Sequence, residues 1–173
     1  LYRWRGDYVD RDFIIDQLAA ISRKYPLAFV EDALQEEDFE GFKLASERIN
    51  TVIVGDDFIC TSLDRAEKAV SMGAARGMIF KPNQAGTLTE ALRTAKFMMD
   101  RGLLVIPSGR AGGTLDSPEK EIAVALGAWV TKTGAPRSGS RTNGFNFLLR
   151  TSEELGVPQT DVMQLEIFKH LHR

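Results

Sequence analysis

The 173-residue sequence has one cysteine, Cys60, no long apolar run and no marked excess of charge of either sign. A single cysteine excludes a disulfide within the chain and is typical of a reducing compartment, so we expect a cytoplasmic protein. No apolar run approaches the roughly 20 residues that cross a bilayer, so we expect no membrane partner. The 22 basic and 24 acidic residues give a net charge of -2. This balance offers no basic field for nucleic acid, and we expect none as a partner.

What the chain does contain is an alternation of short apolar runs and amphipathic stretches. The apolar runs predict strands at residues 27–30, 51–54, 77–80 and 103–106, and a weaker one at 128–130. Helical periodicity predicts helices at residues 12–23, 37–49, 63–72, 88–101, 142–155 and 160–172, and Ser117-Pro118-Glu119 indicates another helix start. Strands that are apolar throughout are buried on both faces, which indicates a parallel sheet covered by helices and therefore an α/β fold.

A charged or hydroxyl side chain follows each predicted strand. These side chains are, in chain order, Glu31, Asp56, Lys81, Ser108 and Lys132. Successive members lie roughly 25 residues apart, about one βα unit, so all five should meet at the carboxyl ends of neighbouring strands. In a (βα) barrel, that end carries the active site.

Two simpler interpretations compete with an active site in a barrel. Charged residues can merely mark where strands leave the core, which suits one strand better than five in the same phase. A doubly wound open sheet is the alternative fold, but the sequence shows no glycine-rich first turn to mark its binding crevice. The predicted strands are about five of the eight that close a (βα) barrel, so this chain alone would leave unpaired sheet edges. We therefore expect further strands upstream, on the same polypeptide or in a partner.

The five side chains, together with Arg110, are suited to one kind of chemistry. Glu31 and Asp56 are hard oxygen ligands of the kind that bind Mg²⁺. Lys81 beside them could act as a base. Lys132 and Arg110 could bind an anionic substrate. Carboxylates, a metal ion and a lysine together suit proton abstraction next to a carboxylate.

Several segments resemble the enolase (phosphopyruvate hydratase) family. They are Tyr25–Asp32 (YPLAFVED), Val54–Asp57 (VGDD), Lys81–Glu90 (KPNQAGTLTE), Lys132–Pro136 (KTGAP) and the tail around Asn146–Arg150. The resemblance covers almost the whole chain. It implies an enolase-like TIM-type barrel, with residues 1–173 as the C-terminal portion of the barrel domain. The N-terminal capping domain and the first strands would then be absent from these residues.

The resemblance also implies a role for each site residue. Glu31 and Asp56 would hold Mg²⁺, and Lys81 would take the α-proton of 2-phosphoglycerate. Lys132 would contact the carboxylate of this small phosphorylated substrate. Arg110 would contact its phosphate, and Ser108 would begin the loop that carries Arg110. The implied protein is a glycolytic hydro-lyase that assembles as a dimer or higher homo-oligomer.

One loop departs from the family pattern. Enolases typically read Ser-His-Arg-Ser-Gly-Glu-Thr where this chain has Ser108–Thr114, with Gly109, Ala111 and Gly113 in place of three polar residues. Three functions therefore stay open: enolase, a related enzyme acting on another carboxylate, and a non-catalytic binding protein on the same barrel.

Lys120, inside a predicted helix, is interpreted as solvated.

Overall fold

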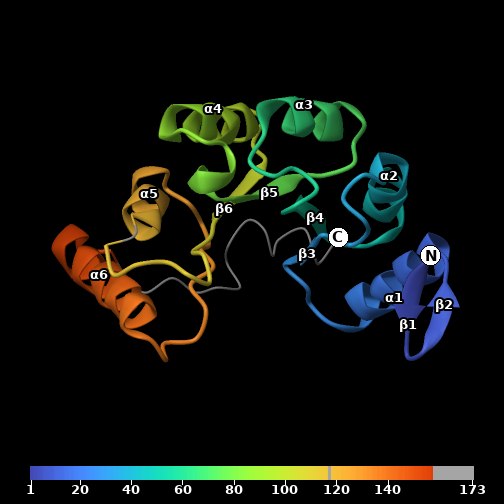
Figure 1. Ribbon diagram of the computed structural model, residues 1–173, viewed down its shortest axis with the longest axis horizontal. Coiled ribbons are helices and arrows are strands. Elements are labelled where there is room, and N and C mark those ends of the chain that lie inside the picture. The colour runs from blue at the N-terminus through green and yellow to red at the C-terminus, as the bar shows by residue number, and fades with distance from the viewer. Residues whose placement is uncertain (117, 158–173) are drawn as a thin grey trace.

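Residues 1–116 and 118–157 are described by a computed structural model, in which helices lie above a parallel sheet and to its two sides (Figure 1). The sheet consists of β3 (Phe29–Glu31), β4 (Val52–Gly55), β5 (Gly77–Phe80) and β6 (Leu104–Pro107). The helices are α1 (Arg11–Lys24), α2 (Phe39–Arg48), α3 (Leu63–Ser71), α4 (Leu88–Met99), α5 (Glu119–Ala125) and α6 (Gly139–Leu155), with a short 3-10 helix η1 (Pro82–Gln84). A hairpin of β1 (Tyr2–Trp4) and β2 (Asp7–Val9) precedes them.

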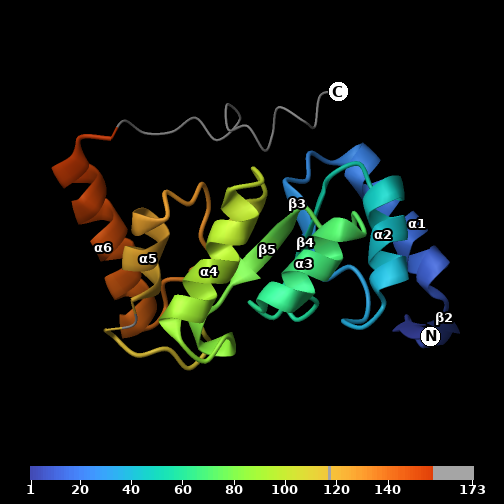
Figure 2. The same cartoon turned by 90° about the horizontal axis from the view of Figure 1, so that it is seen from above.

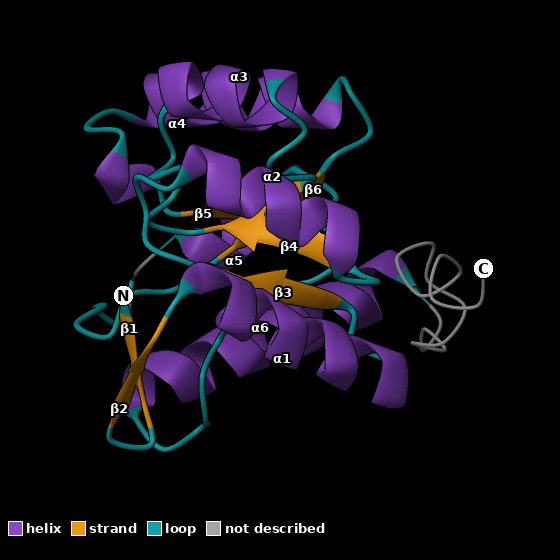
Figure 3. Cartoon of the chain, turned by 90° about the vertical axis from the view of Figure 1, so that its right-hand side faces the viewer, coloured by secondary structure: helices purple, strands orange, loops and turns teal. Residues whose placement is uncertain are grey.

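The strands pair in parallel and in chain order, β3-β4-β5-β6. The helices also follow one another in chain order from α1 to α6 (Figure 2), and the strands lie between α3 and α4 on one side and α1 on the other (Figure 3). This arrangement is that of consecutive βα units of a barrel. The predicted α/β fold with a parallel sheet is confirmed, and four predicted strands are present within two residues of their predicted ends.

Both faces of the sheet are apolar because successive strand residues point to opposite sides. Ile53, Met78 and Val105 belong to the main core, where helices pack on the outer face of the sheet. Val54, Ile79 and Ile106 form a smaller cluster, which we assign to the inner face. This double burial explains why the strands read as continuous apolar runs.

The fifth predicted strand, at residues 128–130, is wrong. The sheet continues beyond β6 only as an isolated parallel bridge between Ser108 and Lys132 within the described part of the chain. There, Lys132 donates its backbone N–H to Pro107 O (2.9 Å), and Gly109 donates to Lys132 O (3.1 Å). A short segment that pairs with one neighbour gains few ladder hydrogen bonds, and Trp129 within it is 54% exposed.

Further differences concern the N-terminal hairpin and the start of α5. The β1–β2 hairpin was not predicted. Its turn uses positive φ at Arg5 (50°) and Gly6 (103°), which matches the twist of a two-residue hairpin turn. Helix α5 begins at Glu119 rather than at the predicted proline, with Pro118 as its N-cap. Ser117 and the predicted helix at 160–172 lie outside the described residues. Within those that are described, no helix is long and apolar enough to cross a membrane.

Candidate active site

The carboxyl ends of the parallel strands bring the predicted site residues together. Glu31 is the last residue of β3, while Asp56, Lys81 and Ser108 each directly follow β4, β5 and β6. Lys132 reaches the same edge through its bridge to Ser108. The parallel register therefore places all five predicted strand-end groups at one end of the sheet.

Two lysine–carboxylate pairs join these strand ends. Lys81 Nζ lies 2.5 Å from Asp56 Oδ2, and both side chains are 13% exposed. Lys132 Nζ lies 2.5 Å from Glu31 Oε1 and 2.6 Å from Oε2. The second pair joins residues about 100 positions apart in the chain, so it links the first strand of the sheet to the segment beyond the last.

Asp32 supports Asp56 from the neighbouring strand end. Its carboxylate accepts hydrogen bonds from the backbone N–H of Asp56 (2.7 Å) and of Asp57 (2.8 Å). Burial raises the pKa of Asp32, the backbone hydrogen bonds oppose this effect, and the nearby charge of Asp56 adds to it. No role was predicted for Asp32, although its place directly after Glu31 was a signal.

Thr61 positions the start of the segment that carries Lys81. Its hydroxyl accepts the backbone N–H of Lys81 (3.0 Å) and donates to Gln84 Oε1 (2.8 Å). Thr61 is 1% exposed and has a positive φ of 49°, as does Cys60 (52°). Non-glycine residues seldom adopt this conformation, so the surrounding contacts hold this loop in an unfavourable backbone shape.

Lys120, on α5, contacts the segment that carries Lys132. It is 2% exposed, and its Nζ donates to Thr131 Oγ1 (3.1 Å) and to Lys132 O (3.3 Å). Burial lowers the pKa of Lys120, while the charges of Glu119 and Glu121 oppose that shift. The interpretation of Lys120 as a solvated helix residue is therefore wrong, because α6 and the 131–132 segment cover it.

A cavity of about 410 Å³ opens at the carboxyl end of the sheet. Its lining includes four predicted site residues and one further cation: Lys81, Ser108, Arg110, Lys132 and Arg141. Glu31 and Asp56 are not part of the lining and adjoin it through their lysine partners. Arg141, in the first turn of α6, was missed because sequence spacing does not relate it to any strand end.

The two carboxylates fit a divalent cation in part. Asp56 Oδ1 is buried and has no hydrogen-bond partner among the described residues, so it is an acceptor in need of a donor or a cation. Within the same residues, no cluster of three or more acidic, histidine or cysteine side chains is arranged around a metal position. Mg²⁺ is commonly held by one or two protein carboxylates together with substrate and water oxygens, so Glu31 and Asp56 suit it.

A carboxylate lies beside the loop that departs from the family pattern. A Cβ added to Gly109 would be 3.0 Å from Glu119 Oε1. Glu119 Oε2 is buried and has no hydrogen-bond partner within residues 1–116 and 118–157. An acidic group from α5 thus borders the loop at the position where Gly109 carries no side chain.

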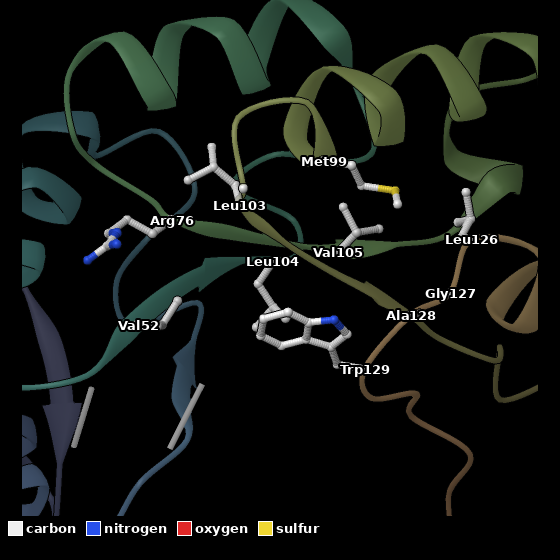
Figure 4. Close-up of a pocket in the computed structure, with 11 residues that line it drawn as sticks. Val52, Arg76, Met99, Leu103, Leu104, Val105, Leu126, Gly127, Ala128 and Trp129 are labelled. Atoms are coloured by element: carbon white, nitrogen blue, oxygen red, sulfur yellow. The ribbon is translucent and has the colours of Figure 1, made fainter. Parts of the chain in front are cut away.

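A second cavity, of about 280 Å³, lies at the opposite end of the sheet. In Figure 4, Trp129 and Leu104 lie on one side of the strands, and Met99 and Val105 lie on the other. Among the described residues, Arg76 is the one charged residue in its lining, and no carboxylate lines it. This cavity has none of the acid–base groups found at the carboxyl ends.

Comparisons with known proteins agree on one family. The family model described as "Enolase, C-terminal TIM barrel domain" matches residues 6–162. A protein named enolase from Methanococcus maripaludis strain C7 is 42% identical over 153 residues, covering 88% of this chain and 36% of its own length. Proteins named enolase from Methanopyrus kandleri (43% identical over 156 residues) and Methanocaldococcus jannaschii (38% over 156) cover 89% and 90% of this chain. The chain spans about a third of the length of these relatives, 36% and 37% for the last two.

Proposed function

The chain belongs to the enolase family, and on that premise we propose that the full-length protein dehydrates 2-phosphoglycerate to phosphoenolpyruvate, reversibly and with Mg²⁺. The observation that carries this proposal is the set of paired strand-end groups, Asp56 with Lys81 and Glu31 with Lys132. Residues 1–173 would be the C-terminal portion of the barrel domain. The capping domain and first strands would belong to the rest of the full-length protein.

Lys81 is the proposed base. In the structure its ammonium is held by Asp56 Oδ2 at 2.5 Å. Asp56 would hold the metal ion together with Glu31, and Lys81 with a neutral amine would accept the α-proton of the substrate at its Nζ. Thr61 keeps the Lys81 backbone in place during this exchange because its hydroxyl accepts the Lys81 N–H.

Glu31 and Asp56 would hold the metal, and the cationic side chains would hold the substrate. When bound, Mg²⁺ supplies positive charge that stabilises the charge developing on the substrate carboxylate. Lys132 exchanges its Glu31 partner for the substrate carboxylate. Arg110, exposed in the cavity wall, binds the phosphate, and Ser108, 5% exposed, fixes the start of its loop.

The test is formation of phosphoenolpyruvate by the full-length protein. We expect turnover of 2-phosphoglycerate that requires Mg²⁺ and stops when a chelator is added. A folded protein that gives no turnover at high enzyme concentration overturns the proposal. Tight Mg²⁺-dependent binding of 2-phosphoglycerate without turnover would instead indicate a binding protein.

A second candidate is a related enzyme that acts on another carboxylate. The observation in its favour is the carboxylate of Glu119 beside Gly109, where an acidic group adjoins the altered loop. A panel of phosphorylated and unphosphorylated 2-hydroxy acids separates the two candidates. Preference for 2-phosphoglycerate over every other acid removes the second one.

The same proposal includes a cytoplasmic homo-oligomer. The single cysteine supports a reducing compartment, and the family resemblance supports self-association. Sedimentation of the full-length protein measures the assembly directly. A dimer or larger species is expected, and a monomer at micromolar concentration contradicts this part of the proposal.

A further inference from the structure

Arg141 reaches the cavity at the carboxyl end of the sheet from α6. Its guanidinium packs on the backbone of Gly134, where an added Cβ would be 2.9 Å from Cζ, 3.0 Å from Nε and 3.1 Å from Nη1. Gly134 has a φ of +74°, a conformation that glycine adopts without cost. Glycine at this position therefore leaves room for the guanidinium at the cavity wall.

The charges that line the cavity are not balanced. Lys81 and Lys132 are each paired with a carboxylate, Asp56 and Glu31. Arg110 and Arg141 make no ion pair with any residue that the structure describes, and the cavity lining contains no acidic residue. Two guanidinium groups are thus left to be matched by an anion.

The position of Arg141 on its helix supports the same conclusion. It lies in the first turn of α6, which has 17 residues and no acidic residue in that turn. The N-terminus of a helix favours anions and disfavours cations. An arginine placed there is in an unfavourable field, which an anion bound between the helix and the guanidinium would relieve.

We propose that Arg141 is a second phosphate-binding arginine, which shares the phosphate of the substrate with Arg110. This proposal rests on the proposed function and makes it more specific. A phosphate monoester carries a charge of about -1.5 to -2 at pH 7 and offers three acceptor oxygens, which two guanidinium groups can match. The site is therefore built for a phosphorylated carboxylate, and an unphosphorylated analogue would leave both arginines without a partner.

The experiment uses the full-length protein with Arg141→Gln and Arg141→Lys. The control is Arg137→Gln, which removes an exposed arginine close in sequence that does not line the cavity. Binding of inorganic phosphate is measured by calorimetry in the presence of a chelator, and the KM for 2-phosphoglycerate is measured with Mg²⁺. Melting temperatures establish that each variant is folded.

We expect Arg141→Gln to weaken phosphate binding and to raise the KM about 10- to 100-fold, as loss of a charge-assisted hydrogen bond predicts. Arg141→Lys keeps the charge but lacks the planar guanidinium, so its phosphate affinity and KM should lie between those of the wild type and of Arg141→Gln. The control should match the wild type. If Arg141→Gln does not fold, the Arg141→Lys variant decides by the same measurements.

Unchanged phosphate binding in the Arg141 variants overturns the inference, and so does an equal loss in the Arg137 control. Absence of phosphate binding by the wild type also overturns it. These results are distinct from failure of the proposed function. A wild type that turns over 2-phosphoglycerate beside an unaffected Arg141→Gln variant refutes this inference alone. A wild type that binds phosphate through Arg141 without turnover refutes the proposed function alone.

Discussion

The Asp56–Lys81 pair makes a prediction that separates stability from activity. Both side chains are 13% exposed and 2.5 Å apart, and Asp56 Oδ1 already lacks a partner among the described residues. Removing one member of a buried pair costs about 3–5 kcal/mol. Because these side chains keep some contact with solvent, we expect Asp56→Leu or Lys81→Met alone to lower the free energy of unfolding by about 2–4 kcal/mol.

The double variant Asp56→Leu/Lys81→Met should recover much of this loss. Neither charge is left unpaired in it, so the two changes should be non-additive, with a coupling free energy of about 1–3 kcal/mol. The assay is urea unfolding of the full-length proteins in a chelator. When Mg²⁺ replaces the chelator, it should stabilise Lys81→Met more than the wild type, since a cation at Asp56 replaces the lost ammonium. All three variants should be inactive.

The exposed pair Lys96–Asp100 is the matched control. Its side chains are 75% and 54% exposed, with Lys96 in α4 and Asp100 four residues later at the C-cap of that helix, so its coupling should be about 0.2–0.5 kcal/mol. Additive effects of the Asp56 and Lys81 changes on the free energy of unfolding would contradict the predicted coupling between the two side chains. An active Lys81→Met variant would refute the role of Lys81 as base.

Three further predictions test the parts that position the site. Gly55→Ala should lower the melting temperature, because the new Cβ would lie 2.8 Å from Ile59 Cγ1, an overpacking that costs about 1–3 kcal/mol. Thr61→Val should lower kcat as well as stability, because the buried N–H of Lys81 loses its acceptor, and unchanged kinetics would contradict this. Lys120→Met should be at least as stable as the wild type at pH 7. Burial lowers the pKa of Lys120 from about 10.5, so wild-type stability rises with pH between the folded and the unfolded pKa, and the advantage of Lys120→Met should shrink there. A pH-independent difference would contradict the last prediction.

The strands and their end groups could be predicted because each follows from local pattern. Strand residues buried on both faces leave unbroken apolar runs, and parallel pairing brings residues that follow each run to one edge. Placement of Glu31, Asp56 and Lys81 therefore needed only the spacing of the runs. The parallel register observed between β3 and β6 accounts for that success.

The residues that were missed depend on tertiary contacts. Lys120 looked solvated on α5, but α6 returns from later in the chain and covers it, with Lys120 Cγ 3.3 Å from the Cβ position of Gly144. Arg141 enters the cavity only because Gly134 leaves space at its backbone. The weak strand at 128–130 failed for a related reason, because its pairing depends on which neighbours it meets. No local periodicity encodes these contacts.

The most direct test of Lys81 as the base is exchange of the α-proton of 2-phosphoglycerate with solvent. The full-length wild type and its Lys81→Ala variant are incubated with the substrate and Mg²⁺ in D₂O, and deuterium at the α-carbon is followed by NMR. If the strand-end cluster abstracts this proton through Lys81, the wild type incorporates deuterium and the folded Lys81→Ala variant does not. Equal incorporation by both proteins, or none by the folded wild type, would contradict this role of Lys81.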